Sequence, residues 1–479
     1  MSCQNPDPAN TVTDRLNQLL SSGGDGYVLS LCPGRQYIIT KPLVFAAPNQ
    51  EISTQGYPTG DERATLVVDG PVADGKGHTT AVDGTCSNCN GVKLRNIQVN
   101  GTRNGASPTQ GGANIEMGGG NSGQLIEHVR SYNPRSWSCL HIAEGSFTCP
   151  GVIVQNNDIG PCGSDIFQEW ADGISLSCAN SIVRNNVISD PTDGGIVVFG
   201  SPGSLIQNNT ISVQNATCLG GINMVDYDPW KGNYTNTIVR DNTILGGFAT
   251  SADPNAPTAA DGVNKEDAII KIGIAIGPRT WFGDRYLKNV SFSGTVLSNH
   301  LSGAFGYAIA ITSARNFTIQ NNELFGNTSF IGSRGPNCTA YDTTPAPQPF
   351  VLDTNNTDSL TFQPGFVQIS DGASLTCILP PAGGDYWPFR GDGPSKNNTS
   401  SGGPTHSGSG GGGKEGGLSG GVKAGIAVGV IFGVALLAVA TYFIRKAALK
   451  RQQQDGGNRR LASEDEDRWE GKQTTYPSS

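Results

Sequence analysis

The sequence predicts an all-β chain that folds as a parallel β-helix, in which short strands stack coil upon coil. The first observation is a repeated run, "IVRNNVI" and "LIQNNTI", which places Asn186 and Asn209 at equivalent positions. The second is a Gly-Ile run, such as "GIVV" from Gly195, that alternates with the first. The third is composition, because 66 glycines and only 15% charged residues favour short strands joined by tight turns.

The Asn-containing run recurs at intervals of 20 to 50 residues, and a repeat of that length indicates a solenoid or a propeller. Each unit holds two or three short β-prone runs without helical periodicity, so helical repeats are excluded, and it is too short for a four-stranded blade. The stretch "VSFSGTVL" at 290–297 reads as a degenerate copy without the Asn pair. The remaining copies end at Asn157, Asn186, Asn209, Asn242 and Asn322.

Stacked coils place equivalent residues in ladders at the ~4.8 Å strand spacing. We therefore expect the Asn side chains to pair with each other at one corner of the coils. Alternation along the Gly-Ile strands predicts two inward apolar ladders. These are Ile115, Leu140, Ile174, Ile196, Ile222, Ile274 and Ile309, and Met117, Ile142, Leu176, Val198, Met224, Ile276 and Ile311. Between them an outward row is expected: Glu116, His141, Ser175, Val197, Asn223, Ala275 and Ala310.

The N-terminal segment predicts a cap for the first coil, which a solenoid needs at its open end. An amphipathic stretch around Leu16, Leu19 and Leu20 precedes a Gly-rich turn and strands with a "CPG" turn. This opening and the "NNxI" coils resemble the pectin lyase-like right-handed β-helix superfamily over roughly residues 10–330. The resemblance implies the right-handed fold but carries no mechanism. The Asp-Asp pair, Gly-His-Gly and Arg-x-Lys of polygalacturonases are missing from the coils, as is the Arg motif of pectate lyases.

A membrane span is predicted at 424–444, because 21 uncharged residues are about the length that crosses a bilayer as a helix. Basic residues from Arg445 onward mark the cytoplasmic side, so the chain before the span is expected outside a plasma membrane, with a single pass. The predicted organisation is 1–70 cap and first strands, 71–330 β-helix, 331–395 C-terminal cap region, 396–423 Gly/Ser-rich stalk, 424–444 span and 445–479 cytoplasmic tail.

The cysteines indicate the cellular compartment of the chain, and its net charge limits the classes of partner that it could bind. All 11 cysteines precede the span, together with Asn-x-Ser/Thr sequons, which is typical of an oxidising, extracellular compartment with structural disulfides. We read Cys86-x-x-Cys89 as such a disulfide, and the odd count leaves at least one thiol without an intrachain partner. The net charge of −8 argues against a nucleic-acid partner. Gly425, Gly429 and Gly433 have the spacing of a helix-dimer motif, which predicts a homodimer.

Long loops around the outward row predict a polysaccharide site. Residues 160–171 and 246–267 enter the Gly-Ile strands, and 226–236 and 277–289 leave them. Aromatic rings suit the apolar faces of sugars, and a few rings around a groove are typical of ligand sites. The predicted substrate-binding residues are Glu116, Trp170, Tyr227, Trp230 and Trp281.

Acidic residues gather in sequence where the first long loop meets the row, and His141 lies in the row. Two carboxyl groups serve glycoside hydrolysis, whereas a lyase needs a base, often with Ca²⁺ at the uronate. Clustered carboxylates could hold that ion, although no metal site is assigned. As an alternative, Asp172 and Asp193 precede glycines, where Asp commonly bonds its own backbone in a turn. The predicted catalytic residues are His141, Asp165, Glu169, Asp172 and Asp193.

Neighbours in a ladder need not form a hydrogen-bonded triad, so Glu116, His141 and Ser175 are not assigned as one. The function expected is that of a membrane-anchored extracellular β-helix that binds or modifies a polysaccharide, as a hydrolase or a lyase if it is an enzyme. The alternative is a non-enzymatic surface adhesin or cell-wall scaffold.

Overall fold

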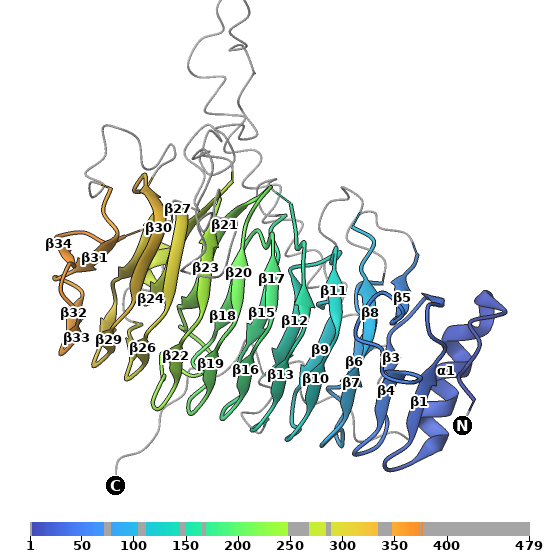
Figure 1. Ribbon diagram of the computed structural model, residues 1–479. Helices are drawn as coiled ribbons and strands as arrows, with labels where there is room; N and C mark the ends of the chain where they lie inside the picture. The colour runs from blue at the N-terminus through green and yellow to red at the C-terminus, as the bar shows by residue number, and fades with distance from the viewer. Residues whose placement is uncertain are drawn as a thin grey trace, which may run out of the picture. The chain divides into compact units, whose positions relative to one another are not determined.

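A computed structural model describes residues 2–70, 78–103, 112–143, 149–164, 169–247, 268–283, 289–333, 347–373 and 375–376. In Figure 1 the described part of the chain begins with the helix α1 (Ala9–Gly23) at one end of the stack of coils and ends with the strand β34 (Val367–Ile369) at the other end. Every strand pair between these ends is parallel, and most strands pair with the strand three elements further along the chain. The described residues therefore form the parallel solenoid that the repeat predicted.

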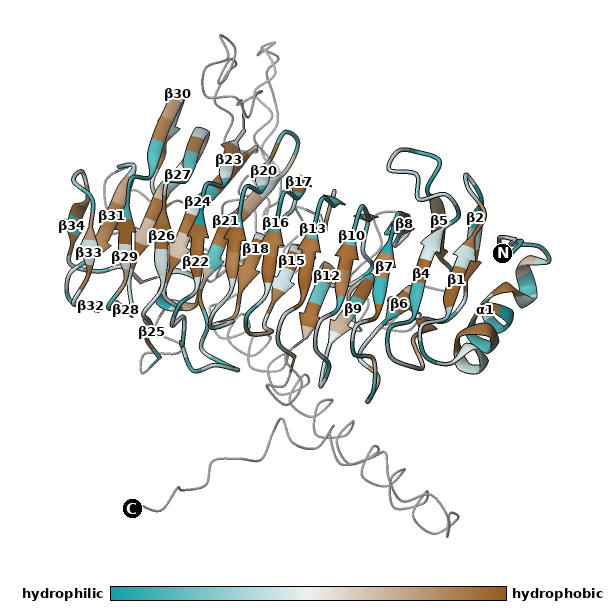
Figure 2. Cartoon of the chain, turned by 60° about the horizontal axis from the view of Figure 1, so that its bottom comes forward, coloured by the Kyte–Doolittle hydropathy of each residue, from teal (hydrophilic) through white to brown (hydrophobic). Residues whose placement is uncertain are grey.

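One sheet of 11 strands takes one strand from each coil and lies toward the viewer in Figure 2. Its strands alternate between half-buried and buried residues, as expected for a sheet with one solvent face. They are, in order, β1 (Val28–Leu31), β4 (Glu51–Thr54), β7 (Lys93–Arg95), β10 (Leu125–Glu127), β13 (Ile153–Gln155), β16 (Ile182–Arg184), β19 (Leu205–Gln207), β22 (Ile238–Arg240), β26 (Thr295–Leu297), β29 (Thr318–Gln320) and β33 (Thr361–Phe362).

A 20-stranded sheet takes the other strands of each coil in two parallel runs that meet at β27. The first run comprises β2 (Gln36–Ile39), β5 (Ala64–Val68), β8 (Ile97–Asn100), β11 (Arg130–Tyr132), β14 (Asp158–Ile159), β17 (Val187–Ser189), β20 (Thr210–Ser212), β23 (Thr243–Gly246), β27 (His300–Ile311) and β30 (Glu323–Phe330). The second run comprises β3 (Leu43–Val44), β6 (Val82–Asp83), β9 (Ile115–Gly118), β12 (Ser138–Ala143), β15 (Asp172–Leu176), β18 (Gly194–Val198), β21 (Thr217–Met224), β24 (Ile269–Ile276), β27, β31 (Phe350–Asp353) and β34. A small third sheet contains β25 (Ser291–Phe292), β28 (Ala314–Arg315) and β32 (Thr357–Asp358).

The Asn ladder forms as predicted and runs without a break through six coils. Asn186 Nδ2 donates to Asn209 Oδ1 at 2.9 Å, and the Asn186 backbone N–H donates to the same oxygen at 3.1 Å. The same two bonds join each further pair in the ladder. The members are Asn157, Asn186, Asn209, Asn242, Asn299 and Asn322, and Gln363 accepts from the last.

The coil that contains residues 290–297 lacks the Asn pair, as predicted, but Asn299 continues the ladder in it. In this coil Ser298 takes the first position of the pair, with φ +52°, and Asn299 takes the second. Elsewhere the first position is held in the same left-handed conformation by residues such as Asn185 and Asn208, which tolerate it better than most side chains. The ladder thus requires Asn only at the second position of the pair.

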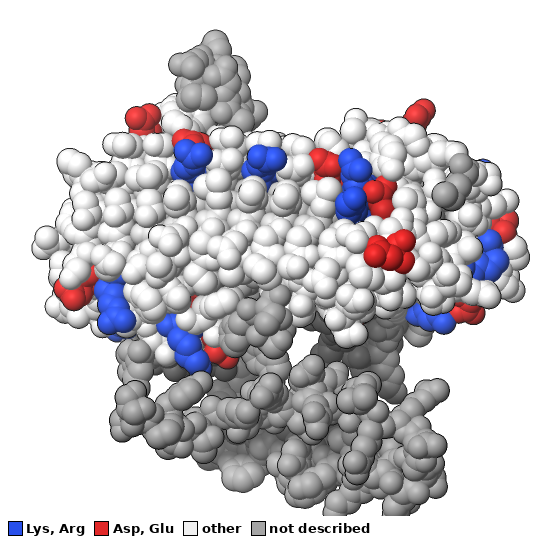
Figure 3. Space-filling model, turned by 90° about the horizontal axis from the view of Figure 1, so that it is seen from below, with Lys and Arg blue, Asp and Glu red and all other residues white. Residues whose placement is uncertain are grey.

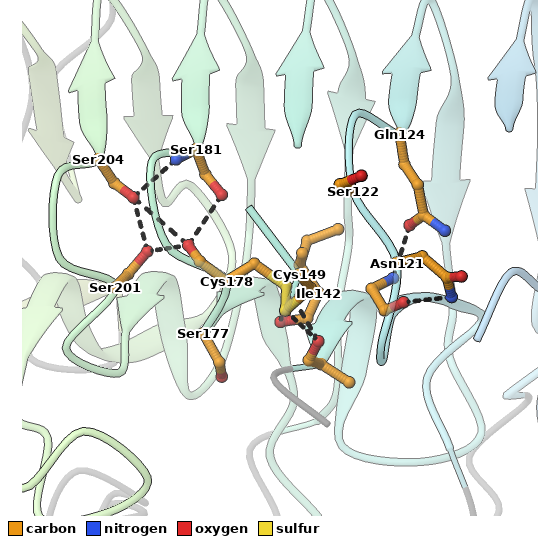
Figure 4. Close-up of a disulfide and its surroundings, with 12 residues drawn as sticks. Asn121, Ser122, Gln124, Ile142, Cys149, Ser177, Cys178, Ser181, Ser201 and Ser204 are labelled. Atoms are coloured by element: carbon orange, nitrogen blue, oxygen red, sulfur yellow. Dashed lines mark hydrogen bonds between the residues drawn. A yellow bond between two sulfur atoms is a disulfide. The ribbon is translucent and has the colours of Figure 1, made fainter. Parts of the chain in front are cut away.

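Polar side chains also close another corner of the coils, between β15 and β19 (Figure 4). Ser204 Oγ accepts from the Ser181 backbone N–H at 2.9 Å and lies 2.8 Å from Ser201 Oγ. Ser181 Oγ in turn donates to the Cys178 carbonyl at 2.8 Å. Cys178 also forms a disulfide with Cys149, so a covalent link and a serine network fix the same turn.

The core is a continuous apolar cluster inside the coils, and both predicted inward ladders belong to it. Helix α1 covers the first coil with Val12, Leu16 and Leu20, each fully buried. On the outer side of the 11-stranded sheet, charges are sparse and both signs occur together (Figure 3). Arg95, for example, pairs with Glu127 at 2.9 Å.

Four disulfides are present among the described residues: Cys3–Cys32, Cys86–Cys89, Cys139–Cys162 and Cys149–Cys178. The Cys86-x-x-Cys89 motif is therefore a disulfide, as predicted. Cys218 is free and buried, and Cys338 and Cys377 lie outside the described residues.

The chain divides into two units, Met1–Ser400 and Ser401–Ser479. In the part that the structure describes, no helix is long and apolar enough to cross a membrane. The span predicted at 424–444, with Gly425, Gly429 and Gly433, lies outside the described residues.

Candidate functional site

The predicted outward row is aligned by the strand pairing of the second run. His141 of β12 is in register with Glu116 of β9 on one side and with Ser175 of β15 on the other. Val197 and Asn223 continue the register through β18 and β21. We call this set the outer row, and its later members are Ala275 and Ala310.

In β15, which contributes Ser175 to the outer row, two consecutive residues face the core. This places a second residue of the strand, Asp172, on the same outer face as Ser175. A Cβ built on Gly173 would lie 2.7 Å from the core residue Ile188, and the next residue, Ile174, also belongs to the core. Two consecutive residues therefore face the interior. As a result, Asp172 and Ser175 lie on the same outer face, and Ser175 Oγ donates to Asp172 Oδ2 at 2.7 Å.

Glu116 and His141 form a hydrogen-bonded pair at the surface. His141 Nδ1 lies 2.7 Å from Glu116 Oε2, and the two side chains are 18% and 16% exposed. Glu116 Oε1 also accepts from the Ala113 backbone N–H at 2.6 Å, which fixes the carboxylate. In the neutral tautomer that donates from Nδ1 to this carboxylate, the imidazole has its lone pair on Nε2.

Ser175 does not extend this pair into a triad. Its hydroxyl is fully buried, donates to Asp172 and lies 3.2 Å from Ser138 Oγ. No hydrogen bond joins Ser175 to His141 among the described side chains, so Ser175 is not poised as a nucleophile.

Asp172 is the acidic residue beside Ser175 on this face, and its charge interacts with that of Asp193. Asp172 is 6% exposed and its Oδ1 accepts from the Gly194 N–H of the next coil at 2.8 Å. It therefore does not form the local turn bond that the alternative interpretation expected. Burial raises the pKa of Asp172 to about 7, and burial together with the charge of Asp172 raises the pKa of Asp193 well above its usual value. Two neighbouring carboxyl groups of this kind hold a proton at neutral pH.

The predicted residue Glu169 is placed in an ion pair beside the face. Its carboxylate lies 3.5 Å from the Arg103 guanidinium and accepts from Ser164 Oγ at 3.2 Å. Arg103 and Glu169 are both nearly buried, which indicates a structural role for this pair. Asp165 lies outside the described residues.

The four predicted aromatic residues do not share one environment. Trp281 is 6% exposed and lies in a second apolar cluster, against which Trp170 packs. The half-buried ring of Tyr227 packs edge-on against Phe282 at 5.2 Å. Trp230 lies across Gly200 and donates from Nε1 to the Ser177 carbonyl at 2.6 Å. Their role in binding a substrate stays a prediction.

Sequence reasoning missed Trp137, the aromatic residue that the structure places at the acidic end of the face. Its ring is 38% exposed and packs edge-on against His141, with ring centroids 4.7 Å apart. Trp137 directly precedes β12 and stands four residues before His141 in "WSCLH". The signal that could have found it is this proximity to the outer row, because Trp137 belongs to none of the long loops.

The second apolar cluster covers the opposite end of the outer row. It contains Val197, Ala275 and Ala310 of the row, together with Trp281 of the short helix α2 (Arg279–Phe282) and Leu375. The outer row thus divides into an open polar end at Glu116 and His141 and a covered apolar end.

No group of three or more His, Cys, Asp or Glu side chains is placed to hold a metal ion among the described residues. The Ca²⁺ role considered for the acidic cluster therefore gains no support from Asp172 and Asp193 alone, which supply two carboxyl groups. Ca²⁺ takes six to eight oxygen ligands in proteins.

Residues 138–257 match the family described as "Right handed beta helix region". No curated protein matches the chain. Three solved structures are similar to it: a DFA-IIIase from Arthrobacter chlorophenolicus, the A-module of a mannuronan C-5 epimerase from Azotobacter vinelandii and a surface adhesin of Streptococcus pneumoniae. Their sequence identities to this chain are 13%, 11% and 13%, and their TM-scores are 0.43, 0.41 and 0.40.

The matches cover 76%, 77% and 67% of this chain and 90%, 96% and 88% of the respective structures. At these identities and TM-scores, none of the three assigns an activity or a ligand to this chain. The matched region and the parallel pairing of the coils agree with the right-handed parallel β-helix that the sequence predicted.

Proposed function

We propose that this β-helix binds a polysaccharide at the open polar end of the outer row and cleaves it there. The observation that carries the proposal is the exposed Trp137 ring against His141, which Glu116 orients, on the same face as Asp172. An exposed aromatic ring offers an apolar face to a sugar, and the polar groups around it would fix the orientation of the sugar.

The polar groups divide into a proton donor and a proton acceptor, as glycosidic cleavage requires. The Asp172–Asp193 pair holds a proton at neutral pH and would protonate the glycosidic oxygen as the bond to carbon breaks. His141 Nε2 would accept a proton, from an attacking water in a hydrolase or from a carbon beside a uronate in a lyase. Glu116 stabilises the imidazolium that results, across the 2.7 Å hydrogen bond.

We further propose that the domain acts outside the cell, tethered by the span at 424–444 through the stalk at 396–423. The sequence supports this through the uncharged run and the basic residues that follow it. The four disulfides among the described residues suit an oxidising compartment.

The test is glycan binding and turnover by the full-length protein in mild detergent, first on a glycan array and then on each polysaccharide that binds. Trp137→Ala should weaken binding at least tenfold, because the sugar loses its stacking surface. The matched control is Phe362→Ala, since Phe362 is 40% exposed in the last strand of the other sheet. A wild-type protein that binds no glycan, or a Trp137→Ala variant that binds like wild type, would refute the proposal.

Binding without cleavage, as in an adhesin, is the second candidate, and one observation favours it. Asp172 is only 6% exposed, so its proton lies beneath the surface. Product analysis separates the two candidates, because new reducing ends indicate a hydrolase and unsaturated uronate ends indicate a lyase. Stable binding with neither product would establish the adhesin.

A further inference from the structure

We infer that Asp83 is a specificity-determining residue of the proposed site and that, together with Glu116, it restricts the site to glycans without uronate carboxylates. The inference rests on the proposed function and deepens it by naming the class of glycan. A lyase removes a proton from the carbon beside a uronate carboxylate, so a glycan without uronates leaves hydrolysis as the cleavage reaction.

The strand pairing extends the outer face one strand beyond Glu116. Asp83 of β6 is in register with Glu116 of β9, just as Glu116 is in register with His141 of β12. The preceding residues, Val82 and Ile115, are also paired, and both are fully buried in the core. Because successive residues of a strand point to opposite sides, Asp83 faces outward with Glu116. Neighbouring strands lie about 4.8 Å apart, which places Asp83 and His141 on either side of Glu116, about 10 Å from each other.

The Asp83 carboxylate is oriented by the chain and keeps one oxygen for a ligand. Its Oδ1 accepts from the Thr85 backbone N–H at 2.8 Å and from Thr85 Oγ at 2.7 Å. No donor to Oδ2 is found in the described part of the chain, and the side chain is half-buried. A sugar hydroxyl can donate to such an oxygen, whereas a uronate carboxylate has no proton to donate.

Glu116 adds a second negative charge at the neighbouring position. One of its oxygens accepts from the Ala113 N–H, and the other lies against His141, so the pair with a neutral imidazole keeps the charge of the carboxylate. A glycan that stacks on Trp137 beside His141 and extends along the row passes Glu116 and then Asp83. A uronate in this position would bring like charges within the Debye length of about 10 Å.

The basic side chains in the described segments near this end are directed to partners within the protein. Arg103 lies 3.5 Å from the Glu169 carboxylate, and Arg135 donates to three backbone carbonyls. Both arginines are nearly buried. Lys41, near the start of the strand that precedes β6 in the sheet, lies 2.6 Å from Asp14 of helix α1. These contacts leave the two carboxylates to set the charge that a glycan meets.

The experiment compares glycans that differ only at C6, using the full-length protein in mild detergent. The probes are oligosaccharides of galactan, mannan and glucan, each paired with its galacturonan, mannuronan or glucuronan counterpart of equal length, alongside the glycan array. We expect the wild type to bind neutral glycans about tenfold or more tighter than their uronate counterparts. This selectivity should fall as salt is raised from about 10 mM to about 150 mM, because the Debye length shortens from about 30 Å to about 8 Å.

The variant Asp83→Asn removes the charge and keeps an oxygen that can accept from Thr85. It should lower the selectivity about 3- to 10-fold, the effect of removing one like charge at about 5 Å near a protein surface. The matched control is Asp241→Asn, which removes the same charge from a corner of the coils away from the outer row. The Asp241 side chain is 42% exposed, and Asn185 and Asn208 hold the same left-handed position in other coils. The control should leave the selectivity unchanged.

Three results would overturn the inference: wild-type binding of a uronate glycan as tight as that of its neutral counterpart, unchanged selectivity in Asp83→Asn, or an equal change in the control. The wild-type comparison and its salt dependence decide the matter even if the Asp83 variant does not fold. If the protein binds a polyuronate and releases unsaturated ends, the proposed function stands and this inference alone fails. If the wild type binds no glycan at all, both fail.

Discussion

Replacing Asn209 by alanine should remove one rung of the Asn ladder and destabilise the solenoid strongly. The Asn209 side chain is fully buried and makes four hydrogen bonds. Its Oδ1 accepts from the backbone N–H and from Nδ2 of Asn186, and its Nδ2 donates to Asn242 Oδ1 and to the Val183 carbonyl. Without it, the Asn186 N–H loses its acceptor in a place that water does not reach.

The size of the loss follows from these contacts. A buried hydrogen bond contributes about 1 kcal/mol net, and an orphaned buried donor costs about 1–3 kcal/mol, so we expect Asn209→Ala to lower the free energy of unfolding by about 4 kcal/mol. The adjacent Asn208 is the matched control. It is exposed and has φ +53°, so Asn208→Gly keeps the turn and should change stability by less than about 0.5 kcal/mol.

The assay is equilibrium denaturation followed by circular dichroism, with wild type and both variants at the same protein concentration. Stacked coils contact only their neighbours, so a broken rung can also split the transition. The two outcomes consistent with the ladder are therefore a lower midpoint or an earlier additional phase for Asn209→Ala. If Asn209→Ala unfolds with the same profile as Asn208→Gly, the ladder does not stabilise the fold and the reasoning is refuted.

Three further predictions address the site. Trp281→Ala should lower the Tm by creating a cavity in the second apolar cluster, whereas Trp137→Ala should leave the Tm within about 2 °C of wild type by thermal melts, because its ring is exposed. The raised pKa of Asp172, about 7 against an ordinary value near 4, means that the folded state keeps a proton that the unfolded state releases, so stability should fall as pH rises from about 4 to 7. Tm values measured across this range should depend less on pH for Asp172→Asn than for wild type, and equal slopes would contradict the shift. Arg103→Leu should cost about 3–5 kcal/mol because it leaves the nearly buried Glu169 carboxylate without its partner, and Glu169→Gln in the same background should recover part of that loss in denaturation experiments.

The repeat made the fold predictable because the ladder depends on identical local chemistry in each coil. The "NN" pair combines a residue that tolerates the left-handed conformation with an amide that bonds both along and across the stack. Only the second position has no substitute in this part of the chain, since Ser298 replaces the first without breaking the ladder. Asp241 takes the first position before Asn242 in the same left-handed conformation. A pattern that required only one Asn, two positions before an apolar residue, fits Asn299, which Leu301 follows at that spacing.

The site was only partly predictable because strict alternation fails within the strands of the second run. Alternation places Asp172 and Ser175 on opposite faces, but the inward turn of both Gly173 and Ile174 brings them to the same side. Gly173 can be read from the sequence, but nothing in the sequence indicates that Gly173 and Ile174 both face the interior. The bond from Ser175 to Asp172, which separates Ser175 from His141, follows from this arrangement alone.

The division of the outer row into an open and a covered end determines where a polymer could bind. At the covered end Val197, Ala275 and Ala310 bury small apolar side chains under α2 and Leu375, so they present no polar group to a sugar. At the open end Glu116 and His141 stay partly exposed, because the described segments around them contribute Trp137 as an exposed ring and not as a cover. Asn223 lies within the covered end, in register with Val197 on one side and with Ala275 on the other. A sugar bound on Trp137 would therefore contact Glu116 and His141, whereas Asn223 and the apolar residues beside it are buried and out of its reach.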